Sequence, residues 1–494
     1  MNRYVKSPDV ITFQDCVNKN YNLSASLFTK LIMKNTNCLK VSDFLTKKLS
    51  IKDLGSEIGS TSYIDKSTYF FMRTKALQKN SFIPEITSES VLPMKPKDFI
   101  KMNLKKGDLI ISKDSNIGEA AILEKDYPNL MLSGAIYKLP VKEELRYYLF
   151  AMIKHDIFRE QLDSIVPKGA TIRHAKTLFL DCLIPLPNEN KGDVIKYISE
   201  LTQAIIEKET LIKSRHEQIL KKIEEELKNN QKENEFKYSL PTFSEVMETG
   251  RLDTGIYGEI YQKNIHLIKN YSYGYFYIKE SEIESGCTPD IRYIDNNSAL
   301  KYQWVTPSFC SDYGTIDECR INMVGINNIK EDSILIINRT SKGGIGEFVG
   351  ITSLYNFAEL KEGQHNQGMY RISSFNKTKL LFILCCLNCK IYRKICASLS
   401  VGSKMKEIKA KHISIIPFPN FPENKQKEIV KLYYNPNVTY NSSDFTLENF
   451  LSKDSVFNQA AGIYELDKSA KYLKKLLNEA IDNIVNDRKV EFKF

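Results

Sequence analysis

Apolar residues recur at helical spacing along one long stretch, residues 190–226. The steps of three, four or seven join Val194, Ile198, Leu201, Ile205, Ile212, Ile219 and Ile223. This spacing predicts a helix that buries one stripe against another helix. Lys208 and Arg215 lie on the same seam, where an unpaired buried charge is costly. We therefore expect a helical rod with either an acidic partner for these cations or a locally open seam.

A second helical pattern follows near the end of the sequence. It begins at 423–434, is interrupted at 435–458, and resumes from about Leu466 to Arg488 with Leu473 and Leu477 on its apolar stripe. We predict that the two rods pair as an antiparallel coiled coil. The apolar positions expected to mediate docking are Ile198, Leu201, Ile205, Ile212, Ile219, Leu473 and Leu477.

One order of elements precedes each rod: a strand, a polar Gly-containing turn, a strand, a further strand, a helix, a Gly turn and a Pro-flanked exit. The first copy uses 107–123, 132–139, 144–165 and 169–187, and the second uses 333–351, 368–372, 380–399 and 401–419. Five anchor pairs are separated by 228–233 residues: Phe28/Tyr257, Gly118/Gly346, Tyr137/Tyr370, Gly169/Gly402 and Pro185/Pro417. This regularity indicates an internal duplication.

The duplication predicts an α+β fold with two β-rich domains separated by long helices. The expected boundaries are 1–189 for the first domain, 190–235 for the central helix, 236–422 for the second domain and 423–494 for the distal helical region. A helix of 37 residues spans on the order of 55 Å, at about 1.5 Å per residue.

Composition narrows the class of protein. Of 494 residues, 70 are Lys or Arg and 60 are Asp or Glu, and the net charge of +10 favours a polyanionic partner, although it can equally serve solubility. No apolar run is long enough to span a bilayer and no signal core is present, so we expect a cytoplasmic protein with reduced thiols. Cys385, Cys386 and Cys389 lie in an apolar helical pattern, which favours core packing over zinc binding.

At this point the chain resembles the specificity subunits of type I restriction-modification systems. The resemblance is carried by RLDTGIY (251–257), by DLIISKDSNIGEAAI (108–122) with its counterpart SILIINRTSKGGIGEFVGI (333–351), and by GATIRHAKTLFLDCLIPLP (169–187). It implies two target-recognition domains that read a bipartite DNA target, and rods that dock methyltransferase subunits. The chain departs from the family pattern in two places. Residues 435–458 interrupt the second rod, and the amino terminus lacks the customary Trp-containing strand, since the only Trp is Trp304.

Reading a base sequence requires polar side chains in the major groove and basic groups at phosphates. In the first domain the candidates lie in two turns: Ser112, Lys113, Ser115, Asn116, Lys168, Gly169, Thr171 and Arg173. In the second they lie in three stretches: Asn338, Arg339, Ser341, Lys342, Gln364, Asn366, Gly402, Ser403, Lys404 and Lys406. A polar turn of this kind is also an ordinary solvated loop in many β-rich proteins.

Enzymatic motifs are missing from the sequence. The nearest approach to a methyltransferase catalytic turn, residues 435–438 (NPNV), lacks the second Pro and the aromatic, and no phosphate-binding Gly-Lys-Ser/Thr loop occurs. His365 and His412 have no catalytic neighbours in the sequence, and we expect structural roles for both. We expect no catalytic residue, metal or cofactor in this chain; S-adenosylmethionine, and any ATP and Mg²⁺, would belong to partner subunits.

The expected partners are double-stranded DNA and methyltransferase subunits, one or two in number, with a restriction or translocase subunit left open. Two alternatives remain at this stage. The chain could be the recognition chain of a two-subunit type II system that cuts on both sides of its site, or a coiled-coil scaffold that does not bind DNA. A steep salt dependence of duplex binding would separate the DNA-binding functions from the scaffold.

Overall fold

The computed structural model describes residues 3–18, 21, 28–166, 174–288, 303–317, 329–340, 348–403 and 405–494. The chain divides into two compact units. The first comprises Met1–Leu211, Tyr440–Gln459 and Lys468–Phe494, and the second comprises Ile212–Thr439 and Ala460–Asp467. Each unit mixes helices with short strands, so the predicted α+β class is confirmed.

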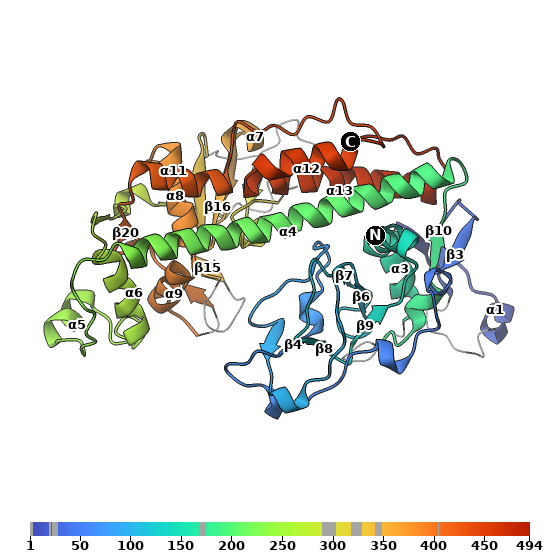
Figure 1. The fold of residues 1–494 in the computed structure, drawn as a ribbon, viewed down its shortest axis with the longest axis horizontal. Coiled ribbons are helices and arrows are strands. Elements are labelled where there is room, and N and C mark those ends of the chain that lie inside the picture. Colours follow the sequence, from blue (N-terminus) through green and yellow to red (C-terminus); the bar gives the residue numbers. More distant parts are fainter. Residues whose placement is uncertain are drawn as a thin grey trace. The chain divides into compact units, whose positions relative to one another are not determined.

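The first unit builds small sheets that are backed by two helices (Figure 1). Its strands are β1 (Val5–Lys6), β2 (Lys30–Leu31), β3 (Cys38–Lys40), β4 (Phe70–Met72), β5 (Val91–Pro93), β6 (Leu109–Ser112), β7 (Ala120–Ile122), β8 (Leu130–Leu132), β9 (Ile136–Leu139) and β10 (Leu183–Pro185). Its helices before the rod are α1 (Phe13–Asn18), α2 (Arg146–Lys154) and α3 (Asp156–Ile165). The main sheet has the order β7-β6-β9.

The second unit repeats this plan. Its strands are β11 (Tyr275–Phe276), β12 (Glu284–Ser285), β13 (Gln303–Val305), β14 (Ser333–Ile337), β15 (Arg339–Thr340), β16 (Thr352–Tyr355), β17 (Gly363–His365), β18 (Met369–Ile372), β19 (Lys406–Glu407) and β20 (Phe418–Pro419). Its helices before the second rod are α5 (Phe243–Thr249), α6 (Glu259–Lys269), α7 (Phe357–Leu360), α8 (Lys377–Leu387), α9 (Lys390–Leu399) and α10 (Ala410–Ser414).

The two main sheets share one register. Leu109 of β6 pairs with Ile122 and Leu139. Its counterpart in β14 is Ile334, which pairs with Leu354 and Ile372. A second, parallel strand pair is also repeated, β4 with β8 and β13 with β17. Because a one-residue slip would turn every side chain to the opposite face, agreement of register is strong evidence for duplication.

The turn between the two central strands differs in length. Ile111 pairs with Ala120, nine residues on, whereas Ile336 pairs with Thr352, sixteen residues on. The second turn is therefore seven residues longer, and it shifts the glycine equivalence that the sequence suggested. Gly118 (φ +77°) corresponds to Gly350 (φ +89°), since an added Cβ at either would collide with the helix behind it. The pairing with Gly346 was wrong for this reason.

The sequence predicted one helix behind the sheet in each unit, but the structure has two in each. The 144–165 pattern divides at His155, whose side chain accepts a hydrogen bond from the N–H of Ile157 and so caps α3. The 380–399 pattern divides in the same place, where Cys389 stands at the N-cap of α9. Apolar periodicity runs through both breaks, so it could not locate them.

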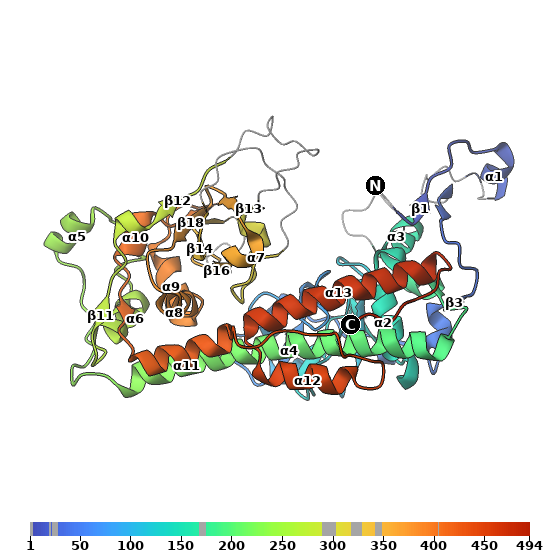
Figure 2. The same ribbon diagram turned by 90° about the horizontal axis from the view of Figure 1, so that it is seen from above.

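The first rod is helix α4 (Lys191–Asn229), which contributes to both units. In the first unit it packs antiparallel to α13 (Ile463–Val485), where Glu209 pairs with Lys474 at 2.7 Å. In the second unit it packs antiparallel to α11 (Glu423–Tyr433), where Lys222 pairs with Glu428 and Glu226 with Lys425. Figures 1 and 2 show α4 in green, with α11 and α13 in red. The predicted antiparallel pairing is thus present in each unit.

The apolar seam residues lie inside these intrachain contacts. Ile198, Leu201, Ile205 and Leu473 are fully buried, and Ile212, Ile219 and Leu477 are buried almost as completely. Burying each such side chain contributes about 1.5–3 kcal/mol. Their side chains hold the rod together and are not available to another protein, so a partner has to contact other faces of these helices.

Lys208 lies in the seam with none of its side chain exposed. Its ammonium group donates to Asp454 at 2.6 Å and to Asn458 at 2.7 Å, both on helix α12 (Phe450–Ala460). It also lies 4.9 Å from the ring centre of Tyr440 and 4.8 Å from that of Phe457. Burial lowers the pKa of Lys208, and Asp454 opposes that shift. The acidic partner expected from the sequence is therefore supplied by the interruption between the rod segments.

Replacing Asp454 with Ala should destabilise the first unit by about 3–5 kcal/mol, because it leaves a buried ammonium group without its counter-charge. The double variant Lys208→Met with Asp454→Leu should recover most of the loss. Urea unfolding monitored by circular dichroism measures both. The matched control is Glu428→Ala, which removes the half-exposed partner of Lys222 and should cost at most about 1 kcal/mol. Equal losses for Asp454→Ala and Glu428→Ala would contradict a special role for the buried pair.

Candidate nucleic-acid interface

In the first unit the turn after β6 contacts the described residues that follow the predicted Gly turn. Asp114, in the turn after β6, forms an isolated antiparallel bridge with His174, which follows the Gly turn. The two side chains also meet, with Nδ1 of His174 2.7 Å from Oδ1 of Asp114. The N–H of Ala175 donates to the carbonyl of Lys113, which extends the contact by one residue. His174 is more than half exposed here and was not predicted as a site residue.

Most of the described candidates in this turn use their polar groups inward. The Ser112 hydroxyl is buried and donates to the carbonyl of Asp114 at 2.6 Å. Lys113 pairs with Asp114 at 2.6 Å. The Asn116 amide donates to the carbonyls of Leu77 at 3.2 Å and Thr74 at 3.4 Å. Ser115 is exposed, with a left-handed backbone (φ +62°), so it is the turn's outermost predicted contact.

In the second unit the three predicted stretches also come together. Strand β15, which contains Arg339, pairs with β19, which contains Lys406. Asn338 joins the third stretch, because its N–H donates to Gly368 at 3.0 Å and its amide group to the Gln367 carbonyl at 3.1 Å. The described start of the turn after β14, residues 338–340, therefore contacts both other stretches. The first unit has a contact that matches the one from Asn338, since the N–H of Lys113 donates to the Ala135 carbonyl at 2.8 Å.

The described candidates of the second unit differ in exposure. Asn338 and Gln364 are buried, whereas Asn366 is half-buried and accepts a hydrogen bond from the N–H of Gly368 at 2.8 Å. Ser403 is exposed, and Gly402 has a left-handed backbone (φ +103°) where an added Cβ would collide with the Met405 carbonyl. The candidates Lys168, Gly169, Thr171, Arg173, Ser341, Lys342 and Lys404 lie outside the described residues.

One site position differs in chemistry between the units. In the parallel strand pair of the first unit, Phe71 lies opposite Met131, and both are buried in an apolar cluster. In the second unit the same register places Trp304 opposite Gln364. Among the residues that the structure describes, the buried indole nitrogen of Trp304 and the buried amide oxygen of Gln364 have no hydrogen-bond partner. The shared frame therefore carries an apolar pair in one unit and a polar pair in the other.

Two described cations at the turns, Lys113 and Arg339, form ion pairs with acids of their own unit. Arg339 pairs with Glu407 at 3.2 Å, as Lys113 pairs with Asp114. A phosphate that approaches either cation has to compete with its carboxylate. Direct contacts are therefore expected to be geometrically selective rather than a simple consequence of positive charge.

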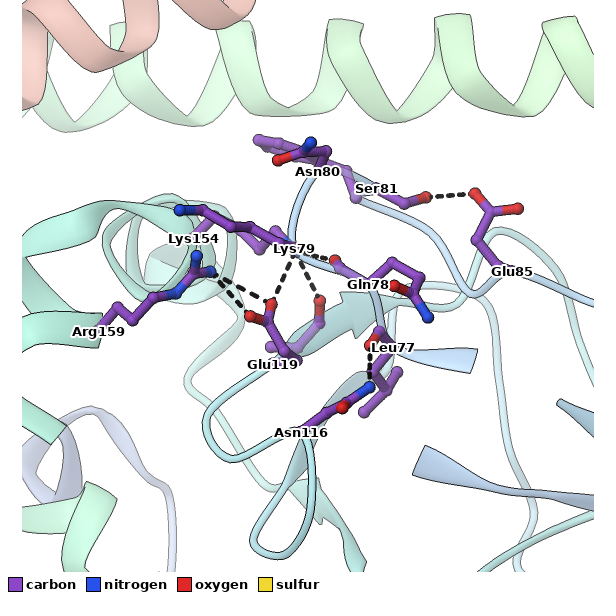
Figure 3. Close-up of polar contacts among 12 residues, drawn as sticks. Leu77, Gln78, Lys79, Asn80, Ser81, Glu85, Asn116, Glu119, Lys154 and Arg159 are labelled. Carbon is purple, nitrogen blue, oxygen red and sulfur yellow. Dashed lines mark hydrogen bonds and ion pairs between the residues drawn. The ribbon is translucent and has the colours of Figure 1, made fainter. Parts of the chain in front are cut away.

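A cluster of polar contacts fixes the turn of the first unit to the loop 77–85 (Figure 3). Lys154 of α2 is almost completely buried and donates to the Gln78 carbonyl at 2.8 Å and to the Ala120 carbonyl at 3.3 Å. Glu119 lies 3.7 Å from Lys154 and forms an ion pair with Arg159 at 3.0 Å. Burial lowers the pKa of Lys154 to about 8, against the opposing effect of Glu119 and Glu209.

The same loop is attached to the rod within the first unit. The Glu209 carboxylate of α4 accepts hydrogen bonds from the N–H groups of Phe82 at 2.7 Å and Ile83 at 3.3 Å. Lys474 of α13 donates to the Asn80 carbonyl at 2.7 Å and pairs with Glu209. A continuous set of contacts thus runs from Asn116 in the turn, through the loop, to the rod. Sequence reasoning missed these residues, because each acts on backbone groups far away in the chain.

Cysteine and histidine side chains of the second unit have structural surroundings. Cys385, Cys386 and Cys389 are buried, and burial raises the pKa of the Cys389 thiol to about 12. His365 is buried, and its pKa is lowered to about 4 by desolvation. Throughout the described ranges, no group of three or more His, Cys, Asp or Glu side chains is placed to hold a metal ion. Within the same ranges, no helix has the length and hydropathy needed to cross a bilayer.

Comparison with known proteins gives no match to a family model and none to a curated protein. Among solved structures, the chain is similar to the S subunit of a type I restriction-modification system from M. genitalium, with 12% identity, coverage of 92% of this chain and 96% of that one, and a TM-score of 0.40. It is also similar to a chain from a study of complex assembly and conformational transition in the type I R-M system, with 12% identity, coverage of 91% and 98%, and a TM-score of 0.28.

A third similar structure is the HsdS subunit from Thermoanaerobacter tengcongensis, with 12% identity, coverage of 89% and 96%, and a TM-score of 0.25. The M. genitalium and T. tengcongensis chains belong to the family that the duplicated order of elements resembles. Superpositions with TM-scores this low carry no argument about function. The functional proposal below therefore rests on the chain's own residues and register.

The stability of the first unit should rise between about pH 8 and pH 9.5 through Lys154. Its folded pKa of about 8 lies below the ordinary value of 10.5, so in this window the unfolded chain binds more protons and deprotonation favours the folded state. At about 1.4 kcal/mol per pKa unit, the gain is about 1–2 kcal/mol. The variant Lys154→Met should lose this rise in urea unfolding at pH 7.5, 8.5 and 9.5. An unchanged slope in Lys154→Met would show that other groups produce it.

Proposed function

We propose that this chain is a DNA-sequence specificity subunit that reads a bipartite target, one half-site with each unit, and directs a DNA methyltransferase to it. One observation carries the proposal: two units keep the same strand register while their outermost turns differ in length and composition. Readers of two different half-sites need a common frame that places the turn and different side chains within it.

The turns suit base reading in distinct ways. The first is short and holds its polar groups against its own backbone, so that Ser115 and the neighbouring His174 stand outermost. The second is longer by seven residues and has the sequence NRTSKGG at its start. Ser, His, Arg and Lys side chains are all able to hydrogen-bond base edges or phosphates. Recognition of two unlike half-sites follows from that difference.

Catalysis is assigned to partner chains. S-adenosylmethionine, and any ATP and Mg²⁺, belong in this proposal to methyltransferase and restriction subunits. The loop 77–85 gives recognition a route to the rod in the first unit, since it is bonded both to the reading turn and to Glu209 and Lys474. A partner that contacts the rod would thereby be positioned by the unit that reads the DNA.

Methylome sequencing tests the proposal directly. Cells that express the chain with a type I DNA methyltransferase subunit from the same source should gain one split methylated motif, absent when the chain is omitted. A chain with the strand frame intact and residues 113–118 replaced by a Gly-Ser turn should lose specificity in one half of that motif only. A stable complex that adds no methylation in either case would favour a scaffold that does not read DNA.

The double substitution Arg339→Gln with Lys342→Gln should weaken recognition of the second half-site, by about 1–3 kcal/mol for the loss of a direct base contact. Affinity is measured with duplexes in which one half-site at a time is scrambled. The matched control is Lys222→Gln, which removes a rod cation paired with Glu428. Equal losses at both half-sites would defeat the assignment of this turn to one of them.

A further inference from the structure

The two halves of the long helix α4 differ in how much of their surface is covered. From Lys191 to Leu211, in the first unit, five of 21 residues are exposed, and three of these are the first three residues of the helix, so that only Lys196 and Glu207 are exposed after them. From Ile212 to Asn229, in the second unit, seven of 18 are exposed: Glu217, Gln218, Lys221, Glu224, Glu225, Lys228 and Asn229. The first half is therefore enclosed, whereas the second keeps an open polar face.

Residues 440–459 supply much of that enclosure. They return to the first unit between two segments of the second, and they bring Asp454 and Asn458 to the buried Lys208. The Tyr440 hydroxyl donates a hydrogen bond to the Asp454 carboxylate at 3.0 Å, and the ring centres of Tyr440 and Phe457 lie 4.8 Å apart. Figures 1 and 2 both place α12 alongside α4.

The last residues of the chain complete the cover within the first unit. The ring of Phe494 packs against Phe450 of α12, with ring centres 4.6 Å apart, and against Tyr197 of α4, with ring centres 5.3 Å apart. The N–H of Lys493 donates to the Tyr197 hydroxyl at 3.1 Å. Tyr472 of α13 donates to the Phe494 carbonyl at 3.1 Å. This aromatic layer joins three segments that lie far apart in the sequence.

The covering segment leaves the second rod and returns to it at almost the same point. The Asn435 amide donates to the carbonyl of Ala460 at 2.8 Å, so the residues on either side of the segment are neighbours in space. Helix α11 ends at Tyr433 and α13 begins at Ile463. Residues 440–459 thus leave the rod and rejoin it without separating the end of α11 from the start of α13.

We propose that residues 440–459 are a built-in occupant of the rod face in the first unit, so that the chain takes up one copy of its methyltransferase rather than two. The inference rests on the proposed function. A duplicated chain offers two equivalent stretches of rod to a partner, and here one of them is occupied by the chain itself. The partner binds the open stretch of the second unit.

The open stretch indicates the chemistry of the partner's surface. Its seven exposed residues on α4 comprise three acids, two lysines and two amides, and α11 adds an exposed face that includes Lys427 and Lys431. A helix surface with mixed charges in the complementary order fits such a face. Binding at this site should therefore weaken as salt is raised.

Native mass spectrometry of the complex with the type I DNA methyltransferase subunit used in the methylation experiment tests the stoichiometry. One methyltransferase per chain is expected, and two per chain would overturn the inference while leaving the proposed function intact. The absence of any complex would overturn both. A variant with residues 437–459 replaced by a short Gly-Ser linker, together with Lys208→Leu, should bind a second copy; if it folds and still binds one, the inference fails.

Point variants test the same idea without altering the fold. Glu224→Lys with Glu225→Lys, on the open face of α4, should weaken methyltransferase binding at least tenfold. The matched control is Lys453→Glu, an exposed charge on the outer face of α12. Binding that is weakened by the control and not by the α4 variant would place the partner on the covered face and overturn the inference.

Discussion

A lysine in an apolar helix seam imposes the strongest constraint in this molecule. Lys208 has no exposed side-chain surface, and a buried ammonium group is tolerated only with a counter-charge and hydrogen bonds. Asp454, Asn458 and two aromatic rings meet that requirement. The second rod is therefore interrupted for a physical reason, since an uninterrupted α11–α13 helix would leave this cation unpaired. The aromatic contacts of the chain's last residues depend on the same excursion.

The two units separate what must be constant from what can vary. The central strands pair at equivalent positions in the two units. A glycine with a left-handed backbone stands at the same place before β7 and before β16. The turn between them changes length by seven residues, and the neighbouring strand pair exchanges Phe71 and Met131 for Trp304 and Gln364. The described variation is therefore concentrated in this turn and in the strand pair beside it, while packing against the helices behind the sheet is preserved.

Sequence patterns predicted the order of elements, the antiparallel rods and, as one of two alternatives, an acidic partner for Lys208. They could not identify Asp454, because it lies 246 residues away in a stretch without a clear apolar stripe. They missed the helix breaks at His155 and Cys389, since apolar periodicity continues across both. At the candidate site, polarity identified the turns, but not which side chains point outward. Ser112 and Asn116 satisfy backbone groups that only the folded chain brings near them.

The difference in turn length has a consequence for how chains of this design diversify. A strand register that accommodates connections of eight residues (112–119) and of fifteen residues (337–351) places little restraint on the loop it carries. Insertions and deletions at this position are thermodynamically inexpensive, because loop-closure entropy grows only slowly with length. Under the proposed function, new specificities therefore arise by exchange of one short segment, without repacking the core.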